Sequence, residues 1–539
     1  MWPLKERRLC NDLFWGMPPW QGIQSILAVT LIRRYATLIF GTTIVVAVAI
    51  ALWLRWSALG SQSLWADEGF TILISQFSPR DICRILRTDT GPPLYYILIH
   101  YWRGWFGISE TSLRAFSALF ATLSLPLFYL VARKFLFSRL SLALAMMLYS
   151  VSFLQIWYAK EARCYALLVF LSLAAVYLAL LCLQKSSAIR LLGLGLAVAA
   201  SLYTHNMAFF YLPGLVVLWF VYPSEMTIRV RIRRAVVVAI LIFVLYVPWL
   251  PTLIVQQRLV KHSFWVTKPT LKDLLATLAI LGGFDSATFQ HVFRSIFHSE
   301  KLFGFWTWTP LFFIIFVLCV LGSLYSVTST NRRKGMALLA YSVLPVLLVF
   351  FESRFFTPLY INRVFTGACV LLPLVFCAPI AFQSGKRQEL FGLIALLVLA
   401  GAAISAFGYL RRERKEDWRG ATEYLLRGPE RQRLVVVAGN SPGTLVRYYS
   451  AGADAPLEIA RLAANFNLTD VSFGSTNVPT ISQLVQDMDS GRYKEIDFAF
   501  SDSAKEAKDL TPYLKTHCAS VDVAEFHWIK VWRCLAEPR

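Results

Sequence analysis

Charged residues are scarce in this sequence, and the shortage excludes an ordinary soluble protein. Only 16% of the 539 residues are Asp, Glu, Lys or Arg, whereas a soluble domain carries about 25%. Hydrophobic residues make up 57% of the chain, and the mean hydropathy is +0.55. Repeated apolar runs are long enough to cross a bilayer, so this composition predicts that most of the chain lies in lipid.

Cysteine motifs are also missing. The nine cysteines include no CxxC pair, which argues against a zinc site or a redox centre. Cys518 and Cys534 are the only cysteines of the polar C-terminal part, and the sequence leaves open whether they pair outside the cytoplasm. No cleavable signal peptide is evident, so we expect the first apolar run to serve as an uncleaved anchor.

Acidic residues are outnumbered by basic ones, 32 to 53, which gives a net charge of +21. Such an excess suits nucleic-acid binding in a soluble protein, but the sequence contains no nucleic-acid-binding motif. The basic residues instead cluster in short loops between apolar runs, as the positive-inside rule requires of cytoplasmic loops. Arg33 and Arg34 precede the first run. We therefore predict a cytoplasmic N-terminus, a multi-pass location in the inner (cytoplasmic) membrane, and no nucleic-acid partner.

About eleven apolar runs of roughly 17–23 residues predict a polytopic α-helical membrane protein. Their predicted ranges are 37–56, 113–133, 140–158, 165–183, 190–207, 209–223, 235–252, 308–328, 336–352, 363–382 and 389–410. Residues 1–36 would form a cytoplasmic N-terminal segment, residues 37–410 a transmembrane domain, and residues 411–539 a small α/β domain outside the cytoplasm.

Alternation of the runs places several segments on the outer side of the membrane, namely 57–112, 253–307, 353–362 and the tail. In the first segment, Leu94 to Phe106 is apolar and aromatic but too short to span, which predicts an interfacial helix. Ser78 followed by Pro79 predicts the start of another short helix.

The tail changes from long apolar runs to shorter elements. Trp418 to Leu426 predicts a helix, and Leu434 to Ala438 predicts a buried strand. The alternation from Phe526 to Cys534 predicts a half-buried strand, with an edge position as one option.

Acidic residues that could carry chemistry lie on the predicted outer side. Asp67 and Glu68 follow the first run closely, where a carboxylate can take a proton from an attacking hydroxyl. An isolated acidic pair more often carries solvated charges of a loop, or caps a helix, than takes part in catalysis. Glu161 lies in a short turn between two runs, where it either faces a cavity or forms a local ion pair with Lys160 and Arg163.

Basic residues on the same side suit a phosphate. Arg354 and Arg363 flank an outer junction, and guanidinium forks bind phosphate well, although interfacial arginines also snorkel. His205, near the outer end of the fifth run, suits a hydrogen bond at a helix end better than catalysis. The placement of these groups predicts a lipid-linked phosphate substrate whose tail remains among the membrane lipids.

An ordered set of segments carries a further signal. The segments are Ser63-Leu-Trp-Ala-Asp-Glu-Gly-Phe, Gly91-Pro-Pro-Leu-Tyr-Tyr-Ile-Leu-Ile-His-Tyr-Trp, Phe106-Gly-Ile-Ser-Glu-Thr-Ser-Leu-Arg, Ile156-Trp-Tyr-Ala-Lys-Glu-Ala-Arg-Cys-Tyr, Leu202-Tyr-Thr-His-Asn, Arg354 to Arg363, and Lys415-Glu-Asp-Trp-Arg. Together they resemble the family-39-like, protein-mannosyltransferase-like branch of the GT-C superfamily of membrane glycosyltransferases, which also includes lipid A aminoarabinose transferases. The resemblance covers most of the chain and is most specific between residues 60 and 170.

The resemblance implies transfer of a sugar from a polyprenyl-phosphate donor to a glycolipid, polysaccharide or protein acceptor on the outer face of the membrane. It implies Asp67 as general base, Glu68 as its support and Glu161 as the second acidic position. Arg363 and Arg354 would bind the donor phosphate and stabilise the leaving group. The other substrate-binding candidates in the matched segments are His205, Tyr95, His100 and Arg163. We expect direct displacement with inversion, because one base and a phosphate leaving group suffice.

The chain departs from the pattern at Gly91, where many relatives carry His before the two prolines. A metal or phosphate role for this position therefore stays open. We do not predict a required metal or other cofactor, and a divalent metal remains an option that no residue pattern in the sequence supports.

Two other functions compete with this interpretation. A lipid-linked sugar flippase or other transporter would favour charged residues at mid-membrane and internal repeats, and the sequence shows neither clearly. An O-antigen-type polymerase or ligase would differ mainly in using a lipid-diphosphate oligosaccharide. A glycoside hydrolase also uses two carboxylates, but the lipid setting argues against it. The sugar, the acceptor and the oligomeric state stay open.

Overall fold

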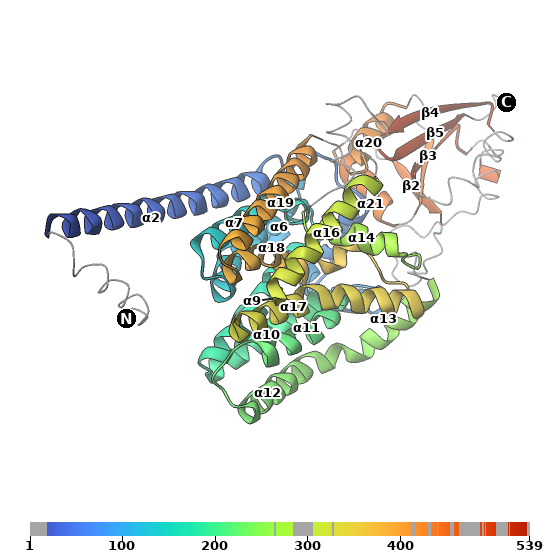
Figure 1. Cartoon of the computed structure of the whole chain (residues 1–539). Helices are drawn as coiled ribbons and strands as arrows, with labels where there is room; N and C mark the ends of the chain where they lie inside the picture. Colours follow the sequence, from blue (N-terminus) through green and yellow to red (C-terminus); the bar gives the residue numbers. More distant parts are fainter. Residues whose placement is uncertain are drawn as a thin grey trace.

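Helices dominate the computed structural model of the chain, and a small β-sheet follows them near the C-terminus (Figure 1). The structure describes residues 19–263, 266–283, 305–325, 328–411, 415–428, 433–438, 440–452, 457–462, 486–487, 490, 492–502, 516 and 518–535. The first half of the predicted N-terminal segment, residues 1–18, therefore lies outside the described residues, as do residues 284–304 of the predicted outer segment 253–307.

Six helices in the described part of the chain are long and apolar enough to cross a membrane. They are α2 (Pro19–Trp56), α6 (Glu110–Phe135), α9 (Tyr165–Gln184), α12 (Ile228–Tyr246) with its continuation α13 (Leu250–Ser263), α17 (Ser329–Phe355) and α19 (Lys386–Leu410). Two helices that meet at a bend of 46° pass the same test as a pair, α7 (Arg139–Ser150) and α8 (Phe153–Ala159). The shorter apolar helices are α10 (Ala188–Thr204), α11 (Tyr211–Val221), α16 (Phe305–Leu324) and α18 (Leu372–Phe382).

Each of the predicted apolar runs overlaps one of these helices or the bent pair, which confirms the polytopic α-helical class. The run 363–382 is only partly an α-helix, because α18 starts at Leu372 and short 3-10 turns precede it. The number of membrane crossings stays a prediction, because four of the corresponding helices are short. The seventh run differs from its predicted range 235–252, since its helix begins at Ile228 and the apolar span continues to Lys261. Of the arginines that precede residue 235, Arg229 and Arg233 are exposed, whereas Arg231 is buried and donates to the backbone oxygens of Phe220 and Ser224.

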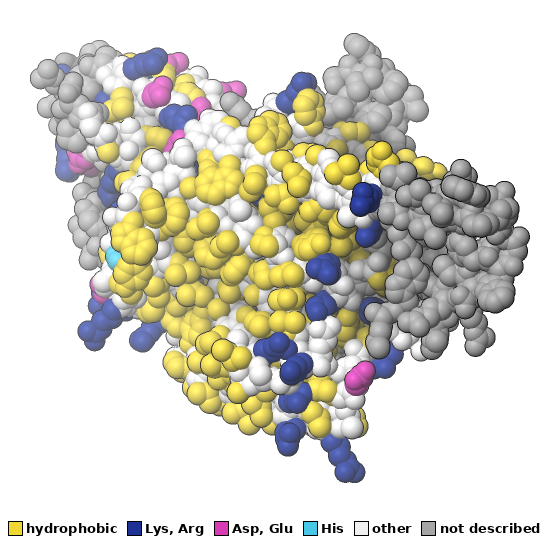
Figure 2. Space-filling view, turned by 90° about the vertical axis from the view of Figure 1, so that its left-hand side faces the viewer, with side chains coloured by type: hydrophobic (Ala, Val, Ile, Leu, Met, Phe, Trp, Pro, Cys, Tyr) yellow, Lys and Arg dark blue, Asp and Glu magenta, His cyan; other side chains and the backbone are white. Residues whose placement is uncertain are grey.

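Hydrophobic side chains cover the outside of the helical bundle. Figure 2 shows them as a broad, continuous area, with many Lys and Arg side chains gathered toward its lower edge. On α2 alone, Leu38, Val45 and Trp53 are at least 60% exposed. An apolar surface of this extent is unsuited to water, so these side chains face lipid in a multi-pass membrane protein.

Three short helices follow α2 and lie between it and α6. They are α3 (Ala66–Ser75), α4 (Pro79–Ile85) and α5 (Leu94–Phe106). The Ser78 hydroxyl accepts a hydrogen bond from the Asp81 amide at 3.3 Å, and Pro79 occupies the first position of α4, which confirms the predicted helix start. The predicted helix from Leu94 to Phe106 is also confirmed as α5, while its position at the membrane surface stays a prediction.

The tail contains one five-stranded sheet of order β2-β1-β3-β5-β4. The strands are β1 (Arg433–Ala438), β2 (Glu458–Leu462), β3 (Glu495–Ser501), β4 (Ser520–Phe526) and β5 (Ile529–Leu535). β1 is parallel to both β2 and β3, and β5 is antiparallel to β3 and β4. Helix α21 (Asn440–Ser450) connects β1 to β2, and helix α20 (Trp418–Leu426) precedes β1. The predicted helix and the predicted buried strand of the tail are both confirmed.

The predicted strand from Phe526 to Cys534 needs two corrections. Its first residues belong to the end of β4 and to a tight turn in which Trp528 has φ 57°, so β5 starts only at Ile529. The strand is also not at an edge, because β5 pairs with β3 on one side and β4 on the other. Buried and partly buried side chains alternate along β5 because one face of the sheet is less covered than the other.

Cys518 and Cys534 form a disulfide across 16 residues of the tail. The pairing that the sequence left open is thereby confirmed. A bond of this kind persists in oxidising compartments, which supports the predicted position of the tail outside the cytoplasm.

Removal of this disulfide should destabilise the tail. Closing a loop of about 15 residues contributes about 3 kcal/mol, so Cys518→Ser should lower the unfolding temperature of the protein in detergent. Peptide mapping with and without reductant should show the two cysteine-containing peptides joined only without it. Cys83→Ser, which changes a free cysteine, is the matched control. Separate peptides in the unreduced wild-type protein would contradict the pairing.

Candidate active site

A cavity of about 900 Å³ lies between the membrane helices and the short helices that follow α2. One part of its wall carries polar and charged groups, and another part is apolar. The charged residues that line it are Asp67, Asp89, Arg163, Arg258, Lys261, Glu352 and Arg363. The apolar residues include Phe209, Phe210, Leu253, Ile254, Val260 and Leu359. A space of this size and mixed lining suits an amphiphilic ligand.

Asp67 lies in the first turn of α3 and reaches the cavity. Its carboxylate Oδ2 accepts a hydrogen bond from Arg363 Nη1 at 2.8 Å and lies 3.8 Å from Arg163 Nη2. The Asp67 side chain is 30% exposed. The positive end of a helix favours a negative charge in its first turn, so this position suits an ionised carboxylate that a ligand can reach.

The two arginines come from distant parts of the chain and converge on Asp67. Arg163 follows the turn after α8, and its Nη1 also donates to the Asp67 backbone oxygen at 3.1 Å and to the Tyr96 hydroxyl at 3.3 Å. Arg363 lies in the short 3-10 helix η4 (Asn362–Phe365), before α18. Two guanidinium groups at one carboxylate leave positive charge in the cavity, which suits an incoming phosphate.

His205 and Asp89 also line the cavity. The His205 Nδ1 accepts a hydrogen bond from the Met207 amide at 3.2 Å, so this nitrogen carries no proton in this arrangement. Burial raises the pKa of Asp89. Asp89 was not among the residues predicted from the sequence, although it lies only two residues before the Gly91-Pro-Pro segment.

The loop that carries Asp89 is held from two sides. Gln256 of α13 donates to the backbone oxygens of Leu86 at 2.7 Å and Gly91 at 3.2 Å. Asn206 donates to the Thr90 oxygen and to Gln256, both at 2.9 Å. These contacts fix one wall of the cavity, and no local motif in the sequence indicated them.

Glu68 points away from the cavity and is completely buried. Its Oε1 accepts from Arg114 Nε at 2.9 Å and from the Ala162 amide at 2.8 Å. Its Oε2 accepts from Arg114 Nη2 at 2.7 Å and from Lys415 Nζ at 3.1 Å. Burial alone would raise the pKa of Glu68, but these two cations lower it to about 2. Glu68 thus stays ionised, and its contacts give it a structural position beside Asp67.

Glu161 is buried behind the cavity wall and does not line the cavity. Its Oε2 accepts from Trp157 Nε1 at 3.0 Å, and its Oε1 has no hydrogen-bond partner among the described residues. Burial raises the pKa of Glu161 to about 7; Lys415 opposes this shift, while Glu68 and the nearby Asp67 add to it. Glu161 can therefore gain or lose a proton near neutral pH.

Three other predicted site residues lie away from the cavity. Tyr95 is buried within the core beneath α5. His100 forms a hydrogen bond through Nδ1 with the Ser75 backbone oxygen at 2.9 Å. Arg354 is exposed at the end of α17. The structure therefore brings together Asp67, Arg163, Arg363 and His205, and it separates them from these three side chains.

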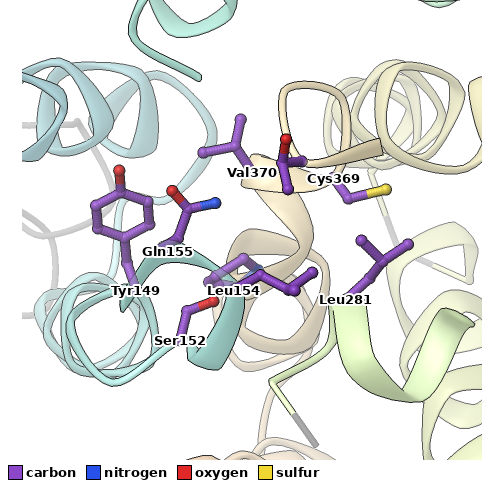
Figure 3. Close-up of a pocket in the computed structure, with 9 residues that line it drawn as sticks. Tyr149, Ser152, Leu154, Gln155, Leu281, Cys369 and Val370 are labelled. Carbon is purple, nitrogen blue, oxygen red and sulfur yellow. The ribbon is translucent and has the colours of Figure 1, made fainter. Parts of the chain in front are cut away.

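A second, much smaller cavity of about 10 Å³ lies inside the helical bundle (Figure 3). Tyr149, Ser152 and Gln155, at the bend between α7 and α8, face Leu281 and Cys369 across it. Its size suits one water molecule, and its lining shares no residue with that of the large cavity. In the part of the chain that the structure describes, no group of three or more His, Cys, Asp or Glu side chains is placed to hold a metal ion.

Known proteins resemble this chain in part of its sequence and in its fold. The family described as "Dolichyl-phosphate-mannose-protein mannosyltransferase" matches residues 90–251. Two crystal structures of ArnT from Cupriavidus metallidurans, in the apo state and bound to undecaprenyl phosphate, each align with a TM-score of 0.55 and 13% identity over 92% of this chain and 99% of that chain. No curated protein sequence matches the chain significantly. The chain therefore shares the fold of ArnT, and its residues 90–251 match the mannosyltransferase family, in agreement with the GT-C resemblance of the sequence.

Loss of the Glu68 charge should be strongly destabilising. Glu68→Gln would leave Arg114 and Lys415 buried without their counter-charge, and breaking a buried ion pair typically costs about 3–5 kcal/mol. Thermal unfolding in detergent should show a large drop in the unfolding temperature. Glu525→Gln, which changes the exposed partner of Lys530, should leave that temperature nearly unchanged. Equal effects of the two substitutions would contradict the structural position of Glu68.

Protonation of Glu161 should make stability depend on pH. Its pKa rises from 4.5 to about 7 in the folded protein, so the folded state holds an additional proton between these values, and stability falls as pH rises through this window. Glu161→Gln removes the ionisation and keeps an acceptor for Trp157. The difference in unfolding free energy, variant minus wild type, should therefore rise by about 2 kcal/mol from pH 5 to pH 8. Thermal unfolding at both pH values measures this gain, and an equal effect of the substitution at both would refute it.

Proposed function

We propose that this protein transfers a sugar from a polyprenyl-phosphate donor to an acceptor hydroxyl at the outer face of the membrane. The observation that carries the proposal is the contact between the Asp67 carboxylate and Arg363 at 2.8 Å within a cavity that also has an apolar wall. A carboxylate suits activation of a hydroxyl, and an arginine suits a phosphate. The acceptor is a glycolipid, a polysaccharide or a protein.

The donor would place its phosphate at the arginines and its lipid chain along the apolar wall. Arg163 and Arg363 offer guanidinium groups within reach of the same point, beside Asp67. Residues such as Phe209, Phe210 and Leu253 provide surface for a hydrocarbon chain. The ArnT structure that aligns with this chain is bound to undecaprenyl phosphate, which supports a ligand of this chemical class.

In the proposed reaction, Asp67 takes the proton of the acceptor hydroxyl as its oxygen attacks the anomeric carbon of the sugar. The new carbon–oxygen bond forms while the bond from the anomeric carbon to the phosphate oxygen breaks. The departing phosphate keeps that electron pair, and Arg163 and Arg363 stabilise its increased negative charge. Attack opposite the leaving group inverts the anomeric configuration.

The proposed orientation puts the cavity and the tail outside the cytoplasm. The disulfide between Cys518 and Cys534 supports this side for the tail, and the charge distribution of the loops supports a cytoplasmic N-terminus. A flippase would move a lipid-linked sugar without consuming it, so a direct measurement of donor consumption separates the two functions.

Asp67→Asn should abolish most of the transfer activity. General-base catalysis typically contributes about 10²–10⁴-fold to a rate, so product formation should fall at least about 100-fold. Purified protein would be incubated with a panel of polyprenyl-phosphate sugars and candidate acceptors, with donor consumption and glycosylated product measured by mass spectrometry.

The controls address folding and binding. Asp67→Asn should keep the wild-type elution profile and still bind undecaprenyl phosphate, because both arginines remain. Asp81→Asn, on the exposed part of α4, should transfer at the wild-type rate. If Asp67→Asn transferred sugar at the wild-type rate, Asp67 would not be the general base. If the wild-type protein moved the lipid-linked sugar across the membrane without consuming it, a flippase would be favoured.

A further inference from the structure

The segment Lys415-Glu-Asp-Trp-Arg connects the last membrane helix to the tail and is not used by the proposed reaction. It begins five residues after the end of α19 at Leu410. The side chains of Lys415 and Glu416 contact the two residues that flank Asp67 in the sequence. None of the five lines the cavity, so the segment can affect chemistry only through other residues.

Lys415 makes the most buried of these contacts. Its Nζ donates to Glu68 Oε2 at 3.1 Å and to the Lys160 backbone oxygen at 2.9 Å, and the residue is 7% exposed. Glu68 is the residue that follows Asp67 in α3. The ammonium of Lys415 therefore holds both the helix that carries Asp67 and the turn that precedes Arg163.

Glu416 and Arg419 hold the start of the same helix. Glu416 Oε2 accepts from the Ala66 amide, the first residue of α3, at 3.0 Å and from Trp418 Nε1 at 2.8 Å. The Arg419 amide donates to Ser63 Oγ at 3.1 Å, and its guanidinium pairs with Glu110. The first turn of α3 thus has tail contacts on each side of Asp67.

The helix α21 packs closely against α3 at Gly69. A β-carbon at this position would lie 2.8 Å from the Ser441 backbone oxygen and 2.8 Å from Leu445 Cγ, so only glycine allows this approach. Ser441 itself lines the cavity. The tail therefore contributes to the cavity wall as well as to the support of α3.

We propose that Lys415 is a positioning residue for transfer: by binding Glu68 and the Lys160 backbone together, it fixes the direction in which Asp67 faces the cavity. The inference rests on the proposed role of Asp67. A displacement of about 1 Å in a reacting group can cost about 100-fold in rate, so a contact that never touches substrate can control the reaction. The tail then affects the reaction by positioning Asp67.

The test uses the full-length protein in detergent and compares Lys415→Met with Lys530→Met. Both substitutions remove one lysine charge from the tail, but Lys530 lies in an exposed pair on β5. Lys415→Met should lower kcat at least about tenfold while KM for the donor changes less than about twofold. Hydrogen exchange at the amides of residues 66–75 should increase, with exchange in β1 and β3 unchanged. Lys530→Met should match wild type in each measurement.

The inference is overturned if Lys415→Met keeps the wild-type kcat, or if α3 exchanges at the wild-type rate. Should Lys415→Met fail to fold, Lys415→Gln supplies a shorter, uncharged side chain that keeps a hydrogen-bond donor but cannot bind Glu68 and the Lys160 oxygen together. This variant should also lower kcat and increase α3 exchange, and wild-type values for both would overturn the inference. The exchange measurement needs no substrate, so it tests the support of α3 even if no donor in the panel is consumed.

Discussion

The buried carboxylate of Glu68 is the constraint on which the packing around α3 depends. Transfer of an ion from water into a protein interior costs several kcal/mol, which only close counter-charges and hydrogen bonds can offset. Arg114 and Lys415 provide the charges, and the Ala162 amide completes the set. Arg114 is 46 residues away and Lys415 is 347 residues away in the sequence. The ionised Glu68 can therefore be accommodated only when α6, the turn after α8 and the tail have all assembled around α3.

This constraint separates two adjacent carboxylates into different environments. Successive residues of a helix point in directions about 100° apart, so the burial of Glu68 directs Asp67 toward the cavity. The turn after α8 repeats this division, because the Ala162 amide binds Glu68 while Arg163 approaches Asp67. In each of these two short segments, one residue contributes to the buried ion cluster and its neighbour contributes to the candidate site. A change in the buried ion cluster is therefore expected to shift the candidate site, because the two share adjacent residues.

The sequence predicted the parts of the fold that depend on local pattern, and it predicted fewer of those that depend on distant contacts. Apolar runs located the helices, and a serine followed by proline located the start of α4. The acidic pair was identified, but neighbours along the chain could not show that Glu68 has two buried cations while Asp67 has a cavity. Arg354 and Arg363 flank one junction, so both were predicted at the donor phosphate, with Arg363 first. They differ because α17 continues to Phe355 and leaves Arg354 exposed at its end, whereas Arg363 lies in a 3-10 turn beside Asp67.

Apolar contacts already join the tail to α3, since Ile72 lies in one buried cluster with Leu445 and Trp418, so the additional buried ion cluster needs a physical reason. Apolar surfaces can slide over one another with small changes in energy, whereas charge-assisted hydrogen bonds lose strength steeply with distance and angle. The Glu68 carboxylate is bound by donors from three directions, which fixes its position and that of the helix turn it belongs to. Asp67 shares that turn, and its carboxylate lies 2.8 Å from Arg363 and 3.8 Å from Arg163. A site that depends on such separations gains more from directional support than from additional buried area.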